Sequence, residues 1–347
     1  MRTWAFSTMS PESEDSGRLQ IAVGVIPDAR RRRVLIARRP DRARHGGMWE
    51  FPGGKQEPGE TIEVALRREL LEELDLRVLA ARPLMRVAHE YTDLRVQLHV
   101  WVVDEWLGEP RGMQGQQFEW VPVSALHERK FPEANLRIIS ALQLPELYLI
   151  TPDLSSYGTE FFEMTRTLLT AGVKLLQFRS YRLAATERPE VLRRLSALCR
   201  ESGTRLVVNG DPAEARACGA DGVHLGAARL MGARDRPLQR PLLVGASCHG
   251  AEELRQAERI DADFAVLGPV ARTRTHPWST PLGWPGFQKL ALSTRQLPIY
   301  ALGGLGPQDL DAARQAGGRG VAMISAIWSA PDPAAAFRAG LGQEAVS

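Results

Sequence analysis

Residues 53–76 read GGKQEPGETIEVALRRELLEELDL and carry the strongest local pattern in the chain. Apolar residues recur here at helical spacing, at Ile62, Leu66, Leu70 and Leu74. We therefore expect a helix from about Thr61 to Leu74 that docks through this stripe. A Gly-rich stretch that includes Gly53 and Gly54 precedes the helix.

Three carboxylates lie on one stripe of that helix, because they are spaced i, i+3 and i+4: Glu69, Glu72 and Glu73. On an exposed helix, like charges at this spacing repel one another by a few tenths of a kcal/mol per pair. A bound divalent cation relieves that repulsion, and hard oxygen ligands favour Mg²⁺ or Mn²⁺. The alternative is a solvated acidic face without a ligand.

Short β-type runs surround this helix. Residues 21–26 and 34–37 are expected to form a hairpin whose solvated turn carries the basic run Arg30–Arg33. The remaining predicted elements are strands at 84–90, 94–103 and 119–122 and a helix at 134–142. We expect residues 19–143 to form a mixed α/β domain behind a flexible tail at 1–18.

From Leu147 onward, short apolar strands alternate with helical stretches. The predicted strands are 147–151, 174–178, 205–209, 222–225, 242–247, 264–268, 298–302 and 320–325. Eight strand–helix units in about 200 residues favour a (β/α)₈ TIM barrel over residues 147–340, with a doubly wound sheet as the alternative. The boundary falls in the short connection Gln143–Glu146.

Composition excludes several classes of function. The chain has 347 residues, which suggests two domains. Its 44 Lys and Arg against 41 Asp and Glu give a net charge of +3, too balanced to indicate a nucleic-acid partner. We expect no membrane span and no secretory signal. Three scattered cysteines, Cys199, Cys218 and Cys248, fit a reducing, cytoplasmic location.

The spacing of the charged residues within 53–76 closely resembles the Nudix box of the Nudix hydrolases. Five residues separate Gly54 from Glu60, seven more precede Arg68, and the remaining acidic residues follow on the same helix. The family's glycine at the end of the helix is Asp75 here, and Asp tolerates the left-handed conformation better than most residues. The resemblance implies an α/β/α sandwich with a mixed sheet.

The same resemblance implies a metal-dependent hydrolysis. The implied ligands of Mg²⁺ are the Gly53 carbonyl and three carboxylates: Glu69, Glu72 and Glu73. Glu60 and Arg68 would orient this cluster, because an arginine paired with carboxylates fixes their rotamers. Hydrolysis of a nucleoside triphosphate would give the monophosphate and pyrophosphate.

Further segments resemble MutT-type 8-oxo-dGTP diphosphatases: 21–26, 38–39, 50–55 and 131–135. By that similarity, Arg39 and Asn135 would meet the oxidised purine and Phe51 would pack near it. An Asn amide offers both a donor and an acceptor, as reading a purine edge requires. The alternative for Asn135 is a helix N-cap, and both roles can coexist.

A phosphate-binding cup is expected in the barrel, where the loops after strands seven and eight often bind phosphate. Gly303 and Gly304 follow the seventh predicted strand, and Ser325 ends the eighth. Backbone N–H groups there are little obstructed by side chains. A tight turn is the alternative explanation of the two glycines.

Several barrel segments resemble thiamine phosphate synthases and their thiazole tautomerase (TenI-like) relatives: 177–179, 221–226, 245–249, 268–270, 280–283 and 301–304. The resemblance implies that Gln177 and Arg179 contact substrate. The acids that bind Mg²⁺ in the synthases are replaced by Gly210 and Arg229, so we expect no synthase activity. A tautomerase needs no metal, and His249 is the candidate acid/base; a structural histidine is the alternative.

The sequence thus favours an Mg²⁺-dependent Nudix pyrophosphohydrolase of oxidised purine nucleoside triphosphates, acting in nucleotide-pool sanitation and DNA repair. One alternative is a hydrolase of thiamine-pathway pyrophosphates. A thiazole phosphate ligand is expected for the barrel, which would act as a tautomerase or as a non-catalytic binding module. The sequence leaves the oligomeric state open.

Overall fold

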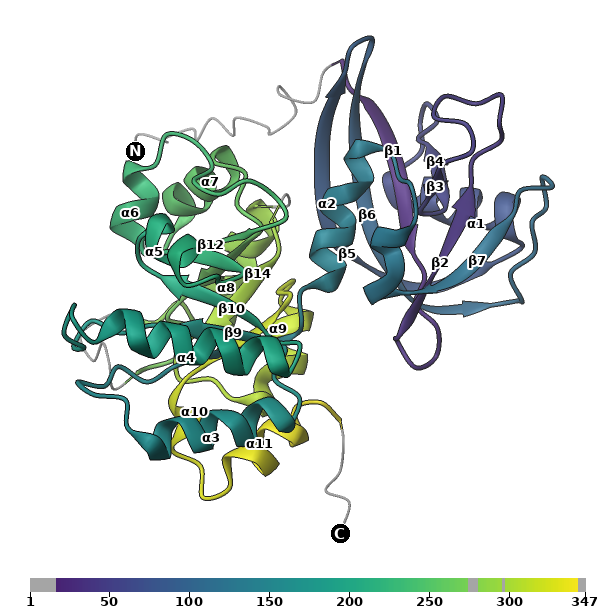
Figure 1. Cartoon of the computed structure of the whole chain (residues 1–347). Helices are drawn as coiled ribbons and strands as arrows, with labels where there is room; N and C mark the ends of the chain where they lie inside the picture. Colours follow the sequence, from purple (N-terminus) through teal and green to yellow (C-terminus); the bar gives the residue numbers. More distant parts are fainter. Residues whose placement is uncertain (1–16, 274–279, 295–296, 343–347) are drawn as a thin grey trace, which may run out of the picture. The chain divides into compact units, whose positions relative to one another are not determined.

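The computed structural model describes residues 17–273, 280–294 and 297–342, and the chain splits into two compact units, Met1–Ile139 and Ser140–Ser347. Each unit is described separately. The predicted tail, residues 1–18, lies outside the described residues except for Gly17 and Arg18. Figure 1 shows the elements of both units.

The N-terminal unit contains a mixed sheet in the order β4-β1-β6-β5. Its strands are β1 (Leu19–Val25), β4 (Gly53–Lys55), β5 (Arg77–Tyr91) and β6 (Leu94–Leu107). Strand β1 runs parallel to β6 and antiparallel to β4, while β5 and β6 form an antiparallel hairpin. A second, antiparallel sheet has the order β3-β2-β7, from β2 (Arg33–Arg38), β3 (Trp49–Glu50) and β7 (Phe118–Pro122). The predicted mixed α/β architecture is confirmed.

Helix α1 (Ile62–Leu74) forms where the apolar spacing predicts it. The Thr61 side chain caps its first turn by accepting a hydrogen bond from the backbone of Val64 at 3.3 Å. At its other end Asp75 adopts the left-handed conformation, with φ 57°. The apolar stripe packs into a core with β-strand residues such as Ala22 and Leu35, and this docking fixes which face of α1 looks away from the core.

Two shorter helical segments follow, η2 (Val123–Glu128) and α2 (Glu133–Gln143), and the last residues of α2, from Ser140 on, belong to the second unit. The start of α2 lies beside β5, where Glu133 is 3.5 Å from His89. Asn135 is the third residue of α2, and its backbone N–H donates to Pro132 O at 2.9 Å. The N-cap explanation of Asn135 is therefore wrong, because the helix begins at Glu133, three residues earlier than that role requires.

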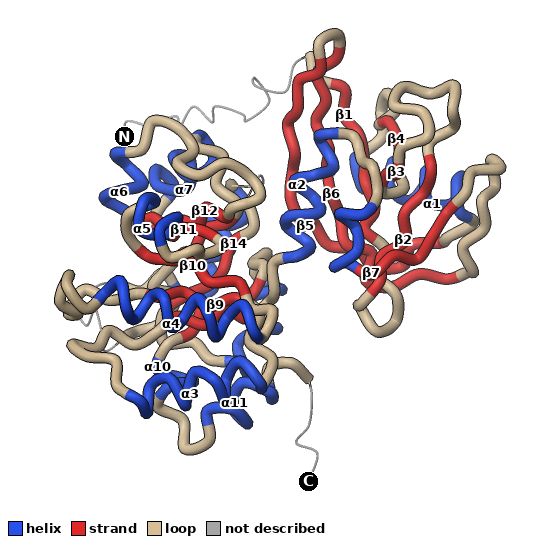
Figure 2. The backbone as a smooth tube through the Cα atoms, in the orientation of Figure 1, coloured by secondary structure: helices blue, strands red, loops and turns tan. Residues whose placement is uncertain are grey.

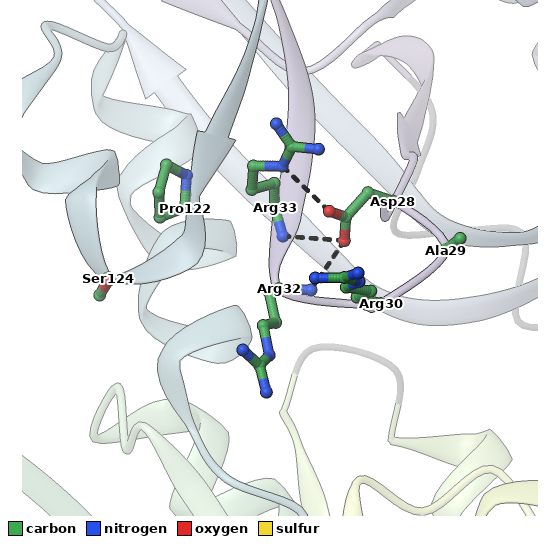
Figure 3. A pocket seen from close by; sticks show the side chains of 7 residues that line it. All are labelled: Asp28, Ala29, Arg30, Arg32, Arg33, Pro122 and Ser124. Carbon is green, nitrogen blue, oxygen red and sulfur yellow. Dashed lines mark hydrogen bonds and ion pairs between the residues drawn. The ribbon is translucent and has the colours of Figure 1, made fainter.

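The turn between β1 and β2 carries the basic run and is ordered by one carboxylate (Figure 3). Asp28 Oδ1 accepts the backbone N–H groups of Arg32 at 2.8 Å and Arg33 at 3.1 Å. Asp28 Oδ2 accepts from Arg33 Nε at 3.0 Å, and Arg31 pairs with Asp104 at 2.7 Å. Arg30–Arg33 are exposed, as expected of a solvated turn. The predicted hairpin is wrong, because β1 and β2 lie in different sheets and are joined only by an isolated bridge between Pro27 and Val34.

The C-terminal unit is a closed barrel of eight parallel strands in the order β10-β11-β12-β13-β14-β15-β8-β9. The strands are β8 (Leu147–Ile150), β9 (Leu175–Phe178), β10 (Arg205–Asn209), β11 (Gly222–Leu225), β12 (Leu243–Cys248), β13 (Phe264–Leu267), β14 (Ile299–Leu302) and β15 (Gly320–Met323). Figure 2 shows them surrounded by helices. The (β/α)₈ prediction is confirmed, and the doubly wound alternative is wrong because β15 pairs with β8.

The barrel helices are short. They are α3 (Thr159–Thr170), α4 (Arg188–Glu201), α5 (Pro212–Ala217), α6 (Ala227–Gly232), α7 (Ala251–Arg259), α8 (Gly283–Ser293), η3 (Pro307–Asp309), α9 (Leu310–Gln315), α10 (Ser325–Trp328) and α11 (Pro333–Ala339). Among the described residues, no helix has the length and apolar character needed to cross a bilayer.

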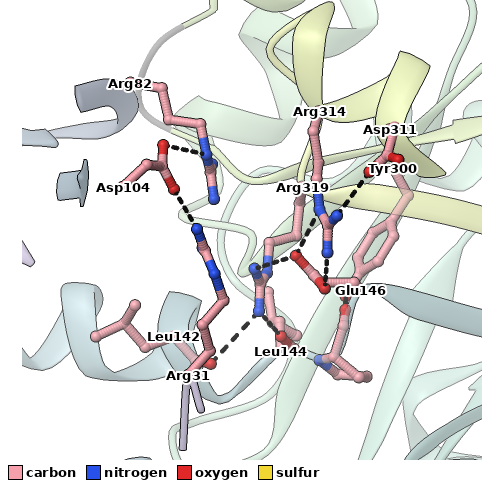
Figure 4. A network of polar contacts seen from close by, with 11 residues as sticks. Arg31, Arg82, Asp104, Leu142, Leu144, Glu146, Tyr300, Asp311, Arg314 and Arg319 are labelled. Atoms are coloured by element: carbon pink, nitrogen blue, oxygen red, sulfur yellow. Dashed lines mark hydrogen bonds and ion pairs between the residues drawn. The ribbon is translucent and has the colours of Figure 1, made fainter. Parts of the chain in front are cut away.

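The segment that leads into β8 is tied to the barrel (Figure 4). Glu146 accepts hydrogen bonds from Arg314, at 3.0 Å for Nε, and lies 3.8 Å from Arg319. Arg319 also donates to the Leu144 carbonyl, and the Tyr300 hydroxyl donates to the Pro145 carbonyl. Leu144 is itself buried. The barrel therefore structurally includes residues ahead of its first strand.

Candidate functional site

Helix α1 and strand β4 approach so closely that only glycine fits between them. A Cβ on Gly54 would lie 2.1 Å from the carboxyl carbon of Glu69. Gly53 has φ +142°, and a Cβ there would lie 2.1 Å from Ala22 O on β1. These two glycines therefore let the Glu69 carboxylate rest directly on the backbone of β4.

Arg68 is the central cation of this site. Its Nη2 lies 2.7 Å from Glu60 Oε1 and 3.0 Å from the Lys55 carbonyl. Its Nη1 lies 2.9 Å from Glu69 Oε1 and 3.3 Å from Glu72 Oε2. These hydrogen bonds raise the pKa of Arg68 and lower the pKa of Glu60. Arg68 thus holds three carboxylates, while the exposed Glu72 is held least firmly.

Glu73 lies on the inner side of α1, where its Oε2 accepts the Gly53 N–H at 3.2 Å. Burial raises the pKa of Glu73 to about 7. The Gly53 N–H and Arg39 oppose this increase, and the neighbouring carboxylates of Glu50 and Glu69 add to it. Glu73 is therefore a crowded, poorly compensated acid at neutral pH.

The donor set fits a hard divalent cation, although its members are not gathered into one triad. Among residues 17–273, 280–294 and 297–342, no three His, Cys, Asp or Glu side chains are close enough to hold a metal ion. Glu69 and Glu72 are turned to Arg68, and Glu73 is turned to Gly53. The fit rests on carboxylate chemistry, on the glycine cradle under Glu69 and on the uncompensated charge around Glu73.

The predicted base-binding residues lie on neighbouring elements. Arg39, just after β2, pairs with Glu50 on β3, and its Nε donates to the Arg44 carbonyl at 2.7 Å. Asn135 is buried on α2, and its side-chain amide makes no hydrogen bond to another described residue. Phe51 is only 3% exposed and stacks on Phe131 at 5.8 Å between ring centroids. The amide of Asn135 therefore keeps its hydrogen-bonding capacity, while Phe51 supports the site from the core.

Two residues near Glu73 were missed by sequence reasoning. Glu50 lies within electrostatic reach of Glu73, and burial raises the pKa of Glu50 against the opposing charge of Arg39. Gln116, in the loop before β7, donates from Nε2 to the Glu73 carbonyl at 2.8 Å. Glu50 stands directly before Phe51 on a short β-type run, so its acidic side chain in an apolar context was an available signal.

A chain of hydrogen bonds crosses the barrel interior at the strand ends. Gln177 donates to the Tyr148 hydroxyl at 2.8 Å and accepts from Asn209 at 3.1 Å. His224 lies 3.4 Å from the Tyr148 hydroxyl and 2.9 Å from Ser247 Oγ. Burial, aided by the charge of Arg179, lowers the pKa of His224 to about 3, so this imidazole is neutral. Sequence reasoning missed Tyr148 and Ser247.

His249 follows β12 and is 60% exposed in its side chain. Its Nδ1 lies 3.3 Å from Glu253 Oε1, and its backbone N–H donates to the same carboxylate at 2.5 Å. Glu253 also caps the start of α7 through the Gly250 N–H at 3.1 Å. An exposed imidazole oriented by a carboxylate retains the capacity for proton transfer.

The two glycines after β14 occupy a tight turn. Gly303 has φ +114°, and a Cβ on it would lie 2.7 Å from Pro269. Gly304 has φ +66°, and a Cβ on it would lie 2.7 Å from the Arg272 carbonyl oxygen. Ser325 is exposed at the start of α10. Close backbone approach thus explains both glycines, and the phosphate cup stays a prediction.

Comparison with known proteins agrees with these two units. The thiamine monophosphate synthase family matches residues 147–327, and the NUDIX domain family matches residues 22–141. The first match covers more than half of the chain. The chain therefore belongs to the thiamine monophosphate synthase family and carries a Nudix hydrolase domain ahead of its barrel.

Two curated relatives match the barrel. A putative thiamine-phosphate synthase of Geobacter sulfurreducens is 38% identical over 197 residues, which cover 56% of this chain and 91% of that protein. The thiamine biosynthesis bifunctional protein ThiM/ThiE of Symbiobacterium thermophilum is 38% identical over 178 residues, 51% of this chain. The chain spans only 37% of that second relative.

Solved structures match each unit. A thiamine phosphate pyrophosphorylase from Pyrococcus furiosus has a TM-score of 0.50 and 29% identity, covering 60% of this chain and 96% of that chain. A structure from work on MutT of Aliivibrio salmonicida and Vibrio cholerae has a TM-score of 0.33 and 35% identity. It covers 36% of this chain and 96% of that chain.

Proposed function

We propose that the N-terminal unit hydrolyses 8-oxo-dGTP and related oxidised purine nucleoside triphosphates to the monophosphate and pyrophosphate. The observation that carries this proposal is the crowding of Glu69 and Glu73 against the glycine pair of β4, beside the Arg39–Glu50 pair. An acidic patch for a cation therefore adjoins groups suited to a base.

The proposed metal ligands are Glu69, Glu72, Glu73 and the Gly53 carbonyl. When bound, Mg²⁺ or Mn²⁺ would supply Lewis-acid activation of water and of the phosphoryl oxygens. Arg68 and Glu60 position Glu69 and Glu72 through the hydrogen bonds described above. The hydrogen bonds between Glu60 and Arg68 would keep Arg68 in place when Glu69 and Glu72 hold the cation.

Base selection is assigned to Arg39 and Asn135, with Phe51 as support. The free amide of Asn135 can donate to a carbonyl and accept from an N–H of the same purine edge. We expect Asn135→Ala to weaken discrimination of 8-oxo-dGTP from dGTP about tenfold while slowing turnover less, because an unpaired base edge costs binding selectivity. The ratio of the two kcat/KM values measures this effect. An unchanged ratio would contradict the assignment.

The deciding experiment is a turnover panel on the whole chain with Mg²⁺. It compares 8-oxo-dGTP, dGTP and thiamine diphosphate by release of pyrophosphate or phosphate. We expect the highest kcat/KM for 8-oxo-dGTP. Turnover of the thiamine compound at an equal or higher rate would replace the first substrate assignment.

A second candidate substrate, a thiamine-pathway pyrophosphate, is favoured by one finding. The chain belongs to the thiamine monophosphate synthase family, so both units would then act on related compounds. The turnover panel distinguishes this candidate directly, because 8-oxo-dGTP and thiamine diphosphate have only their phosphoanhydride bonds in common.

For the barrel we propose binding of a thiazole phosphate without phosphate synthase activity. The proposed contacts are Gln177, Arg179, the Gly303–Gly304 turn and Ser325. His249 is the proposed acid/base if the barrel is a thiazole tautomerase. Calorimetry of the whole chain with thiazole phosphate tests the ligand, and loss of a tautomerase signal in His249→Gln tests the chemistry. Absence of binding heat would remove the ligand assignment.

A further inference from the structure

Three arginines follow the ends of two barrel strands, β9 and β11, which both pair with β10. Arg179 comes directly after β9, Arg188 begins α4 beyond it, and Arg229 lies in α6 after β11. We refer to Arg179, Arg188 and Arg229 as the mouth arginines. Three cationic groups in one region require anions, either from the protein or from a ligand.

Arg188 is fully engaged by the protein. Its Nε donates to Glu214 at 2.5 Å, Nη1 to the Ser180 carbonyl at 2.8 Å and Nη2 to the Asn209 carbonyl at 2.9 Å. A Cβ on Gly210 would lie 3.2 Å from both Arg188 Nη2 and Glu214 Oε2. The Arg188–Glu214 pair therefore lies in tight contact with the position that a Cβ at residue 210 would take.

The other two mouth arginines are much less compensated. Arg229 is 55% exposed in its side chain and lies 3.8 Å from Asp211, whose other oxygen accepts the Ala213 N–H at 2.8 Å. Arg179 lies over the Tyr181 ring at 4.7 Å and makes no ion pair with any residue that the structure describes. The nearby Asp153 is occupied by two backbone N–H groups.

These residues do not fit the Mg²⁺ that thiamine phosphate synthases imply. Position 210 has no side chain, a Cβ there would lie 3.2 Å from the Arg188–Glu214 pair, and position 229 carries a positive charge. No three acidic, His or Cys side chains of the described part of the barrel are grouped for a metal. The charge that a cation would supply is present instead as two guanidinium groups.

We infer that the barrel binds the diphosphate group of a phosphorylated ligand directly through Arg179 and Arg229, without a divalent cation. Guanidinium groups match phosphate oxygens in geometry and are always charged. The proposal concerns binding only, and no bond is made or broken. It rests on the proposed function of the barrel as a phosphate-ligand module.

Inorganic pyrophosphate is the probe, titrated by calorimetry into the whole chain in excess EDTA. EDTA removes metal-dependent binding at the Nudix site. The test variant is Arg179→Gln/Arg229→Gln. The matched control is Arg166→Gln/Arg255→Gln, which removes two exposed arginines of α3 and α7 and the same total charge.

We expect pyrophosphate to bind without metal, the test variant to lose at least tenfold in affinity, and the control to bind as the parent does. Binding that appears only with Mg²⁺, or equal affinity of both double variants, would overturn the inference. Thiazole phosphate separates the two proposals. If it binds while pyrophosphate does not, only this inference fails; if neither binds, the proposed role of the barrel fails as well.

Discussion

At the level of single residues, Glu73 differs from the other acids of the Nudix box. Glu60, Glu69 and Glu72 each touch Arg68, whereas Glu73 has only the Gly53 N–H as a direct partner. Burial together with two nearby carboxylates leaves its charge undercompensated. The side chain with the least internal support is thus the one that gains most from an external cation.

We expect Glu73→Gln to lower kcat for nucleotide hydrolysis by roughly 10³-fold or more, because a neutral amide is a weak ligand of a hard cation. Steady-state kinetics with saturating Mg²⁺ measures this change. Glu63→Gln is the matched control, since Glu63 lies on the same helix but pairs with Arg67 at the surface. A Glu73→Gln enzyme with a near-normal rate would contradict the assignment of the ligand.

The raised pKa of Glu73 gives metal binding a pH dependence. Mg²⁺ needs the ionised carboxylate, so lowering the pH from 8 to 6 across a pKa of about 7 should weaken apparent Mg²⁺ affinity about tenfold. Calorimetry at both pH values measures the affinity, and the proton release that accompanies Mg²⁺ binding, measured in buffers of different ionisation enthalpy, gives a second readout. Glu73→Gln should remove most of this dependence.

The raised pKa of Glu73 also makes the free energy of unfolding depend on pH. Here a rise in pH lowers stability, whereas it strengthens Mg²⁺ binding. Without metal, the folded state binds the proton of Glu73 more tightly than the unfolded chain does. The contribution of this group to the free energy of unfolding is therefore largest at low pH and falls as pH rises to about 7. If Glu73 instead increased the free energy of unfolding of the metal-free protein as the pH rises from about 4.5 to about 7, the buried position of its carboxylate would be contradicted.

At the level of secondary structure, the end of α1 departs from the family pattern, because the left-handed position holds Asp75 with φ 57°. We expect Asp75→Gly to raise the free energy of unfolding by about 0.5 kcal/mol and Asp75→Val to lower it by about 1–2 kcal/mol. Chemical denaturation of both variants measures these changes. Equal stability of the three proteins would show that the turn carries no conformational cost.

Elements with strong periodicity could be predicted from sequence, and contacts between distant elements could not. Helix α1 appears as a periodic apolar stripe because one of its faces is buried, whereas the barrel strands appear as short continuous apolar runs because both of their faces are buried. The pairing of Arg39 with Glu50 and the hydrogen bond between His224 and Ser247 depend on which strands become neighbours. Local patterns do not encode that register, and so the pairing of Glu50 with Arg39 and of Ser247 with His224 could not be predicted.

Interactions within the box show the same limit. The i, i+3, i+4 spacing correctly places three glutamates along α1, but it does not reveal that Arg68 binds two of them. The arginine lies one residue before Glu69, and its long side chain folds back across the helix surface. Rotamer choices of this kind depend on the whole site.

At the level of the whole molecule, the barrel begins structurally at Ser140 and not at its first strand. Its own arginines hold the carbonyls of Gln143 and Leu144, and Leu144 is buried. We expect a fragment 140–347 to be more stable than a fragment 147–347 by about 3 kcal/mol, from burial of Leu144 and the lost hydrogen bonds. Denaturant unfolding of the two fragments measures the difference. Equal denaturation midpoints and equal m-values for the two fragments would show that residues 140–146 do not stabilise the barrel.

Closure of the barrel also orders events during synthesis. Strand β8 needs β15 as its partner, and more than 160 residues separate the two along the chain. Until the ribosome has released the last of them, one margin of the growing sheet has no hydrogen-bonding partner, whereas every strand of the Nudix unit has already emerged. Nascent chains of this protein should therefore carry a finished hydrolase while the rest is still a substrate for chaperones.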